Sequence, residues 1–222
     1  MNHKLNTILA WSLLAATLTN GLSGCFPVVA ASAGAGALLA ADRRTSGTYV
    51  EDEGIEWKVQ NRASDRFGDR VHVNAVSFNR IVLLAGEAPD EATREELTRI
   101  AQGVPNVRNV VNEVRIGANT SLSNRANDAA LTSKVKARFV DQATFGVQHV
   151  KVYTEAGTVF LMGTVTRREA DAATDLARTT SGVSKVVRVF EYLGEEDARR
   201  LDGQAAQGQS PAGGGAEVHP IR

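Results

Sequence analysis

The sequence lacks the features that mark several large classes of protein. It has one cysteine, which excludes a disulfide framework within the chain. Lysine plus arginine equals aspartate plus glutamate, 25 against 25, so the excess of positive charge typical of nucleic-acid-binding proteins is missing. No apolar run reaches the roughly 20 residues that a membrane-spanning helix needs. Any attraction to an anionic partner must therefore come from a local cluster of charge.

Signatures of catalysis are absent from the sequence as well. It has neither a Gly-x-Ser-x-Gly nucleophile motif nor a Gly-x-x-x-x-Gly-Lys phosphate-binding loop. His72 and His149 occupy equivalent positions of a repeat described below, and no further histidine or cysteine lies near them at metal-ligand spacing. The sequence thus predicts no catalytic residue, no cofactor and no metal site, although sites assembled from distant residues escape such an analysis.

The cysteine lies at the end of an apparent export signal. Lys4 supplies positive charge before the apolar stretch 8–18, which has the length of a signal-peptide core and is too short to span a bilayer. The tetrapeptide Leu-Ser-Gly-Cys that ends at Cys25 resembles the bacterial lipobox. This resemblance implies cleavage before Cys25 and acylation of that cysteine. An ordinary secretory signal with a chance cysteine is the alternative interpretation.

The residues after Cys25 bear on where the chain is anchored. Several acyl chains on one residue give stable anchoring, because each buried CH₂ contributes about 0.8 kcal/mol. In the signals that the lipobox resembles, aspartate after the cysteine retains the chain at the inner membrane, whereas Phe26 stands here. We therefore expect the periplasmic face of the outer membrane. Residues 26–41 are apolar and rich in small side chains, and they predict either a tether or a segment lying on the bilayer surface.

An internal repeat occupies most of the remaining chain. Aligning Gly86 with Gly163 brings two β-rich hairpins into register, and Gly103 then matches Gly182 after a gap of two residues. Asn79-Arg80 has the composition of a tight hairpin turn, and the strand glycines Gly86 and Gly163 indicate a bulge or close backbone packing. Each copy predicts the order αββαβ. The expected helices are 54–65, one after Pro89-Asp90, 128–140 and one around 172–177; the expected strands are 71–78, 81–88, 110–114, 150–154, 158–165 and 187–192.

The predicted fold class is α+β, with two tandem αββαβ domains that each form a three-stranded mixed sheet with two helices on one face. Domains of this size bury little core alone, so we expect them to pack together. The expected boundaries are a signal peptide over 1–24, a lipidated tether over 25–50, domains over 51–117 and 127–193, a linker over 118–126 and a disordered tail over 194–222.

The repeated pattern of strand, glycine, helix and Gly-Val resembles the BON domain, and the resemblance covers residues 51–193. Further segments match outer-membrane lipoproteins that carry two such domains: 42–45, 134–136, 159–163, 165–170 and 181–183. This resemblance implies binding of anionic phospholipid through the second domain, chiefly through its first helix. It also implies a role in outer-membrane integrity and under envelope stress, with enrichment at the cell-division site.

The distribution of charge agrees with that implication. Residues 51–123 contain nine basic and twelve acidic residues, a net −3, whereas 127–193 contain nine and seven, a net +2. A basic side chain close to an anionic bilayer contributes about 1 kcal/mol. Lys134, Lys136 and Arg138 lie on the first helix of the second copy, beside Ala130 and Leu131, which could enter the acyl boundary. The alternative is a solvated basic face, and that helix lacks the interfacial tryptophan or tyrosine of many membrane contacts.

Arg167 and Arg168 are weaker candidates, at a helix N-terminus that could hold a head-group phosphate. The predicted function is that of a lipid-anchored, non-enzymatic protein that binds anionic phospholipid. The competing hypothesis is a periplasmic adaptor for envelope proteins without lipid recognition, for which an exposed strand edge could serve. The sequence indicates no nucleic-acid partner and leaves the oligomeric state open.

Overall fold

The computed structural model describes residues 42–207. The predicted signal peptide, Cys25 and most of the predicted tether therefore lie outside the described residues. Within 42–207, none of the helices combines the length and the apolar character needed to cross a bilayer.

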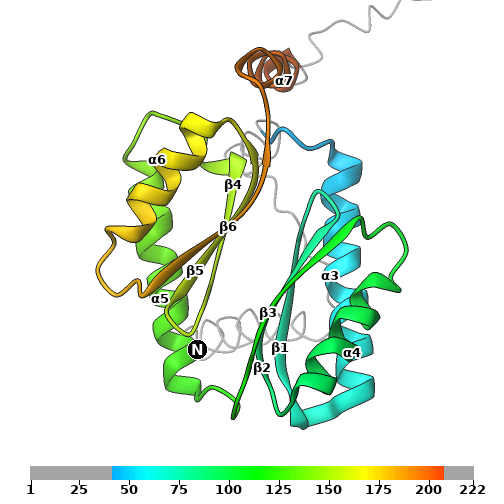
Figure 1. The fold of residues 1–222 in the computed structure, drawn as a ribbon. Helices are drawn as coiled ribbons and strands as arrows, with labels where there is room; N and C mark the ends of the chain where they lie inside the picture. Colours follow the sequence, from blue (N-terminus) through cyan, green and yellow to red (C-terminus); the bar gives the residue numbers. More distant parts are fainter. Residues whose placement is uncertain (1–41, 208–222) are drawn as a thin grey trace, which may run out of the picture. The chain divides into compact units, whose positions relative to one another are not determined.

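Two αββαβ units follow one another along the chain, as predicted, and the fold class is α+β (Figure 1). The linker contributes little length, because α5 begins only six residues after β3 ends. The first unit contains α3 (Ser46–Phe67), β1 (His72–Phe78), β2 (Ile81–Ala88), α4 (Glu91–Gln102) and β3 (Asn109–Ile116). The second contains α5 (Leu122–Val140), β4 (Val150–Glu155), β5 (Thr158–Val165), α6 (Arg167–Arg178) and β6 (Lys185–Tyr192), and α7 (Glu195–Gln207) follows.

Each unit forms a three-stranded mixed sheet with its second strand in the centre. β2 pairs antiparallel with β1 and parallel with β3, and β5 pairs in the same two ways with β4 and β6. The predicted tight turn at Asn79-Arg80 is confirmed, since both residues have positive φ, 50° and 65°. The parallel pairing requires a crossover, which α4 and α6 provide.

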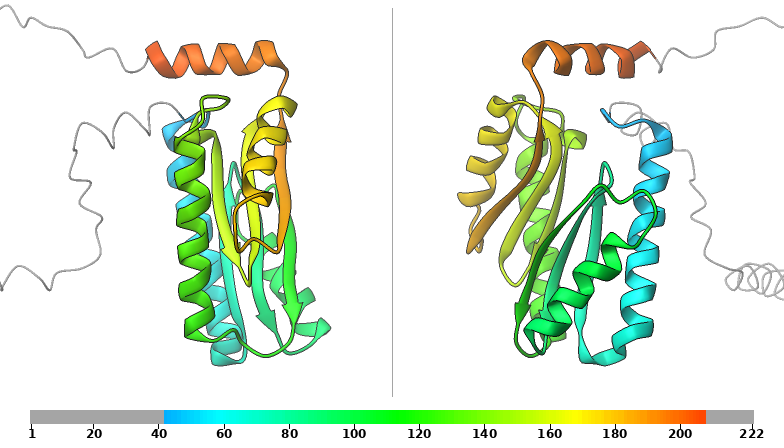
Figure 2. Two further views of the ribbon diagram at one scale, coloured as in Figure 1. Left: turned by 90° about the vertical axis from the view of Figure 1, so that its left-hand side faces the viewer. Right: turned by 45° about the vertical axis from the view of Figure 1, so that its right-hand side comes forward.

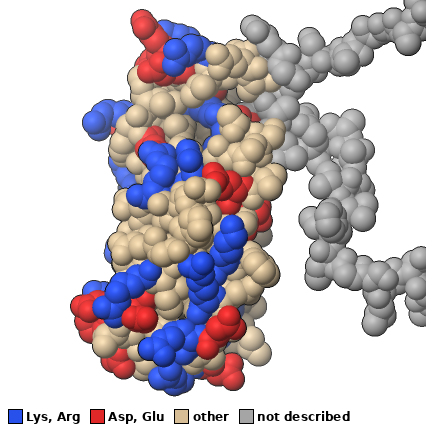
Figure 3. All heavy atoms as spheres, turned by 90° about the vertical axis from the view of Figure 1, so that its right-hand side faces the viewer, with Lys and Arg blue, Asp and Glu red and all other residues tan. Residues whose placement is uncertain are grey.

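The two helices of each unit cover one face of its sheet (Figures 1 and 2). Asp90 accepts a hydrogen bond from the backbone N–H of Thr93 at the start of α4, and Thr166 with Glu169 forms a complete capping box at the start of α6. Figure 3 shows the side of the first unit on which its helices lie, where basic and acidic side chains are interspersed. That surface therefore has no single sign of charge.

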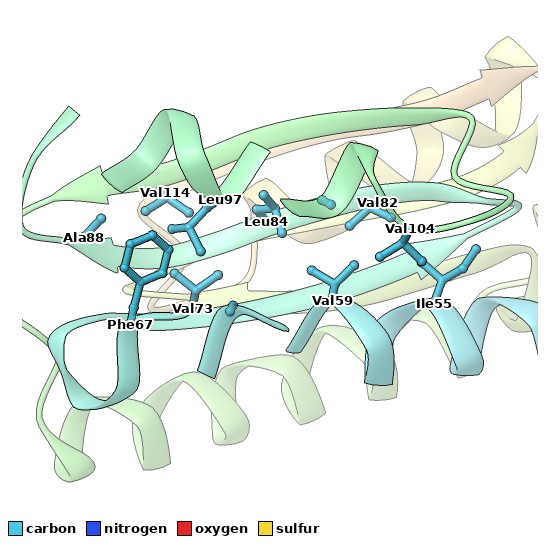
Figure 4. Packing of buried hydrophobic residues seen from close by; sticks show 12 residues of the cluster. Ile55, Val59, Phe67, Val73, Val82, Leu84, Ala88, Leu97, Val104 and Val114 are labelled. Atoms are coloured by element: carbon cyan, nitrogen blue, oxygen red, sulfur yellow. The ribbon is translucent and has the colours of Figure 1, made fainter. Parts of the chain in front are cut away.

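The hydrophobic core of each unit lies between its sheet and its helices. In the first unit, Ile55 and Val59 of α3 pack against Val82 and Leu84 of β2, together with Leu97 of α4 (Figure 4). The alternate residues of the central strands point to the other face of each sheet. Together with residues of β1, they form a cluster that joins the two units, and its buried members are Val76, Phe78, Leu83, Ala85, Phe160 and Met162. The expected packing between the two domains is confirmed.

Both strand glycines lie where two backbones approach closely, as predicted. A β-carbon on Gly86 would come within 1.9 Å of the carbonyl oxygen of His72, and Gly86 has φ +129°. A β-carbon on Gly163 would come within 2.3 Å of the carbonyl oxygen of His149. Glycine at these equivalent positions lets the first two strands of each sheet pair without a break.

Three segments contain more helix than the sequence indicated. α3 begins at Ser46, inside the predicted tether, because Thr45 caps it by accepting from the backbone N–H of Thr48. α5 begins at Leu122, inside the predicted linker, because Ser121 caps it in the same way. The prediction of a disordered tail from residue 194 is wrong for α7, where Ala198 is buried and Asp202 forms an ion pair with Arg43.

Candidate functional site

Helix α5 carries the predicted lipid-binding residues, and its two sides differ sharply in composition. Four side chains are buried at helical spacing: Asp128, Leu131, Val135 and Phe139. The opposite side forms an exposed stripe, in which Leu122 and Val140 at the two ends are 80% and 67% exposed. Small side chains and one lysine fill the stripe between them: Ala126, Ala129, Ser133 and Lys136. We call these six residues the α5 stripe.

A shift of 76 positions superimposes α5 on α3 of the first unit. The shift matches the buried side chains Asp52, Ile55 and Val59 with Asp128, Leu131 and Val135. Because the buried positions agree, each exposed residue of α5 has a counterpart at the same place on α3. This internal comparison separates features shared by both helices, which serve the common fold, from features that only α5 has.

Lys134 and Lys136 are both exposed, but they lie on different sides of α5. Lys134 borders a pocket of about 460 Å³ next to the Ala156–Gly157 turn, and Lys136 borders another of about 350 Å³ that Phe78 and Val152 also line. Within residues 42–207, neither ammonium group has an ion-pair or hydrogen-bond partner. One uncompensated cation, Lys136, thus lies within the α5 stripe, and the other, Lys134, lies to one side of it.

Arg138 has a structural role that the sequence analysis did not anticipate. Its Nη1 donates to the carbonyl oxygen of Leu176 at 2.7 Å and to the hydroxyl groups of Thr179 and Thr180, so it caps the C-terminal end of α6. Arg62, its counterpart on α3, donates in the same manner to the carbonyl oxygen of Gly103 after α4. Because both repeats use this arginine in the same way, its contacts serve the common fold and not the proposed lipid contact.

The two apolar candidates on α5 also separate. Ala130 is exposed, next to the α5 stripe. Leu131 is only 6% exposed and belongs to the core of the second unit, where its side chain faces Gly182. The prediction that Leu131 enters a bilayer is therefore wrong, because its methyl groups already pack inside the protein.

Arg167 and Arg168 are exposed at the start of α6. The guanidinium of Arg167 lies 5.0 Å from the ring centroid of Tyr192, and that of Arg168 lies 4.0 Å from a carboxylate oxygen of Glu195. Arg138 contacts the opposite end of α6, and a helix of 12 residues is roughly 18 Å long. The two arginines therefore do not form one cluster with the lysines of α5.

Two buried aspartates with matching roles escaped the sequence analysis. Asp52 accepts from the backbone N–H groups of Asn79 and Arg80 at 2.8 and 2.7 Å, and so holds the first hairpin turn. Asp128 accepts from the backbone N–H groups of Ala156 and Gly157, both at 2.8 Å, and holds the second. The sequence did contain a signal for them. Each aspartate occupies the same position of the repeat, one helical turn before the first buried aliphatic residue of its helix.

A second missed network ties both ends of the described chain to the second unit. Arg43 forms a paired contact with Glu169 at 2.8 and 2.9 Å and another with Asp202 of α7 at 2.8 and 2.9 Å. Burial raises the pKa of Glu169. Its contacts with His149, Arg43 and the backbone N–H of Thr166 outweigh this effect and hold the pKa well below its usual range. The ring nitrogen Nδ1 of His149 lies 3.8 Å from Oε1 of Glu169.

The lowered pKa of Glu169 predicts a specific acid sensitivity. A carboxyl group whose pKa is lower in the folded state stabilises the fold above its unfolded pKa, and this contribution is lost as the pH falls. Below about pH 4.5, we expect the free energy of unfolding of the parent chain to fall by about 1.4 kcal/mol more per pH unit than that of the Glu169→Gln variant. Glutamine is the control because it keeps a side chain that can cap α6. Urea denaturation of both proteins between pH 5 and pH 3 tests this; equal slopes would contradict it.

One group of side chains has the composition and spacing of metal ligands. His72, Glu87 and Glu155 each offer an atom within 4.8 Å of the others. They come from β1, β2 and β4, so both units contribute. The prediction that no metal site exists rested on spacing along the chain, which cannot reveal ligands that only the packing of two domains brings together.

Comparison with known proteins agrees with the fold. The chain matches the BON domain over residues 51–118 and again over 127–194. It is similar to the outer membrane lipoprotein DolP of Haemophilus influenzae, with 39% identity over 183 residues that cover 82% of this chain and 94% of that protein. It is also similar to a 21 kDa hemolysin of Actinobacillus pleuropneumoniae (34% identity, 68% and 79% covered) and to the osmotically-inducible protein Y of Escherichia coli (29% identity, 81% and 92% covered). The chain therefore belongs to the BON-domain family, as an outer-membrane lipoprotein with two such domains.

Proposed function

We propose that this lipoprotein, anchored by acyl chains on Cys25, binds anionic phospholipid through α5 of its second BON domain and thereby supports the integrity of the outer membrane. In this proposal the protein is a binding protein and not an enzyme, and the site of cell division is one place where it acts. The observation that carries the proposal is the composition of the exposed side of α5, which bears Lys134 and Lys136 and no carboxylate.

The comparison with α3 supports this assignment. Lys134 has a basic counterpart in Lys58, but Lys136 replaces the neutral Gln60. Two acidic residues of α3, Glu53 and Glu56, correspond to Ala129 and Thr132 of α5, and the acid that α5 does contain, Asp128, is buried. Helix α3 contains five acidic and three basic residues, whereas α5 contains one acidic and four basic residues, so only α5 attracts an anionic surface.

The shape of the helix supports a contact parallel to the membrane plane. The α5 stripe runs the length of the 19-residue helix, which corresponds to roughly 28 Å. Its small side chains would let the helix backbone approach the head groups, while Leu122 and Val140 at its ends would enter the acyl boundary. Lys136 within the stripe and Lys134 beside it would then lie level with the lipid phosphates.

The lysines of α5 provide the direct test. With the chain 26–222, which lacks the acylated cysteine, we expect co-sedimentation with phosphatidylglycerol-containing vesicles, weaker at higher salt, and none with purely zwitterionic vesicles. Lys134→Glu combined with Lys136→Glu should weaken this binding at least about 30-fold, because each lysine contributes about 1 kcal/mol and each glutamate adds repulsion. Circular dichroism should show an unchanged fold, since both side chains are exposed.

The first domain supplies the matched control. Lys58→Glu makes the same substitution as Lys134→Glu at the equivalent helix position, and it should leave binding close to that of the parent chain. Trp57 is the single tryptophan of the chain 26–222 and is 66% exposed on α3, so its fluorescence should not shift to the blue on binding. Equal loss of binding in the Lys58 and Lys134 variants would contradict the assignment to α5.

The same vesicle experiment also tests the adaptor hypothesis. Selective, salt-sensitive binding to the anionic vesicles supports lipid recognition by the protein itself. If the chain 26–222 binds neither kind of vesicle, the acyl anchor is its only membrane contact, and binding of envelope proteins becomes the leading explanation.

A further inference from the structure

A buried cluster between the two BON domains is not used in the proposed function. His72 is the first residue of β1, Glu87 lies opposite it on β2, and Glu155 is the last residue of β4 in the other domain. His72 Nε2 is 3.9 Å from Glu155 Oε1, and one ligand atom of each residue lies within 4.8 Å of the other two. Glu87 is 2% and Glu155 6% exposed.

Glu155 has an unfilled acceptor. Its Oε2 accepts from the hydroxyl of Tyr153 at 2.5 Å and from Asn74 Nδ2 at 3.4 Å, whereas its buried Oε1 has no hydrogen-bond donor. A buried carboxylate oxygen without a partner is costly, and a cation facing it would remove that cost.

Glu87 is held firmly and still has capacity. It accepts from Arg115 Nη2 at 2.5 Å and from the hydroxyl and backbone N–H of Thr120 at 2.6 and 3.0 Å. A carboxylate offers about four lone-pair positions, so about one remains. Hydrogen bonds of this kind commonly orient metal-binding carboxylates. Arg115 supplies one positive charge against the two carboxylates. The charge of a divalent cation can therefore be accommodated at this site.

Two of the three residues, His72 and Glu155, border a pocket that opens to solvent. A pocket of about 480 Å³ is lined by His72 and Glu155 together with Asn74, Tyr153 and Arg125, among others. It provides a path for an ion and space for water to complete the coordination. Ligand atoms around tetrahedral zinc lie roughly 3.3–3.5 Å apart, so His72 and Glu155 would need to close by only about half an ångström.

We propose that His72, Glu87 and Glu155 form a site for a divalent transition-metal ion that links the two BON domains. One imidazole nitrogen with two carboxylates suits zinc or manganese better than magnesium or calcium, which prefer oxygen ligands alone. The ion joins strands of the first domain to a strand of the second, and it therefore stabilises their packing.

Zinc is the probe for the test. The full chain, purified in a non-ionic detergent and stripped with chelator, is dialysed against Zn²⁺, and bound metal is counted by mass spectrometry. We expect one zinc ion per chain and a higher melting temperature with zinc than without. Glu155→Gln and His72→Gln should each weaken zinc binding by roughly 10–100-fold or more. Glu95→Gln, which removes the same charge from an exposed position of α4, should bind zinc like the parent.

The outcomes separate the metal site from a purely structural ion pair. If the parent binds no zinc, or if both cluster variants bind it as the parent does, the proposal is overturned. If the variants lower the melting temperature equally with and without zinc while the parent shows no zinc-dependent stabilisation, His72 and Glu155 act only as an interdomain ion pair. A variant that fails to fold is recognised by circular dichroism, and the other variant then decides.

Discussion

Replacing Gly86 by alanine is expected to lower the free energy of unfolding by at least about 4 kcal/mol, among the largest effects of a single substitution. The new methyl group would lie 1.9 Å from the carbonyl oxygen and 2.9 Å from the carbonyl carbon of His72. Both are backbone atoms of the paired strand, so no side-chain rotation relieves the clash. The φ of +129° is also one that alanine rarely adopts.

Urea denaturation of the chain 26–222, followed by circular dichroism, measures this effect. Gly54→Ala is the matched control, since Gly54 lies within α3 and no atom comes within 4 Å of its missing β-carbon. That substitution should stabilise the protein by about 0.5–1 kcal/mol. If Gly86→Ala stays within about 1 kcal/mol of the parent, then β1 and β2 do not approach each other as described.

Replacing Asp52 by alanine is expected to cost about 3–5 kcal/mol, because several buried donors lose one shared acceptor, at about 1–3 kcal/mol each. Asp52 is 1% exposed and pairs at 2.8 Å with Arg44, whose side chain is 7% exposed and keeps a second partner in Asp42 at 2.7 Å. The substitution also leaves the hydroxyl of Ser77 and the backbone N–H groups of the first hairpin turn without their acceptor. Several buried donors thus lose their partner together.

The repeat offers a graded comparison for this prediction. Asp128 holds the second hairpin turn but forms no ion pair with a buried arginine among residues 42–207, so Asp128→Ala should cost less than Asp52→Ala. Glu53→Ala, at the exposed neighbour of Asp52, should change the free energy of unfolding by no more than about 0.5 kcal/mol. Thermal or urea denaturation of the three variants tests the order, and equal costs for the two aspartates would count against the role given to Arg44.

The strands and hairpins could be predicted from the sequence because their signals are local. The runs around Leu84 and Leu161 are continuously apolar, and glycine at the same place in both made the repeat visible. Both sides of β2 and β5 are buried, one by helices and the other by the opposite sheet, which explains why these runs do not alternate with polar residues. The strand ends differ from the prediction by at most two residues.

The candidate site could be predicted only in part, because its residues depend on tertiary contacts. Lys134 and Lys136 are exposed as expected, but spacing alone could not show that Arg138 reaches the end of α6 or that Leu131 faces inward next to Gly182. The composition after residue 194 suggested disorder, yet Asp202 pairs with Arg43, 159 positions earlier in the chain. Contacts of that range leave no trace in local composition.

One apolar cluster between the two sheets makes each BON domain of this chain depend on the other. Its buried members are Val76, Phe78, Leu83, Ala85, Phe160 and Met162. Each sheet buries its second face only against the other sheet, so either domain alone would offer water an apolar surface across its central strand. The duplication has therefore not produced two interchangeable modules. Each domain covers the apolar face of the other domain's sheet. A domain separated from its partner would therefore need another surface to cover that face.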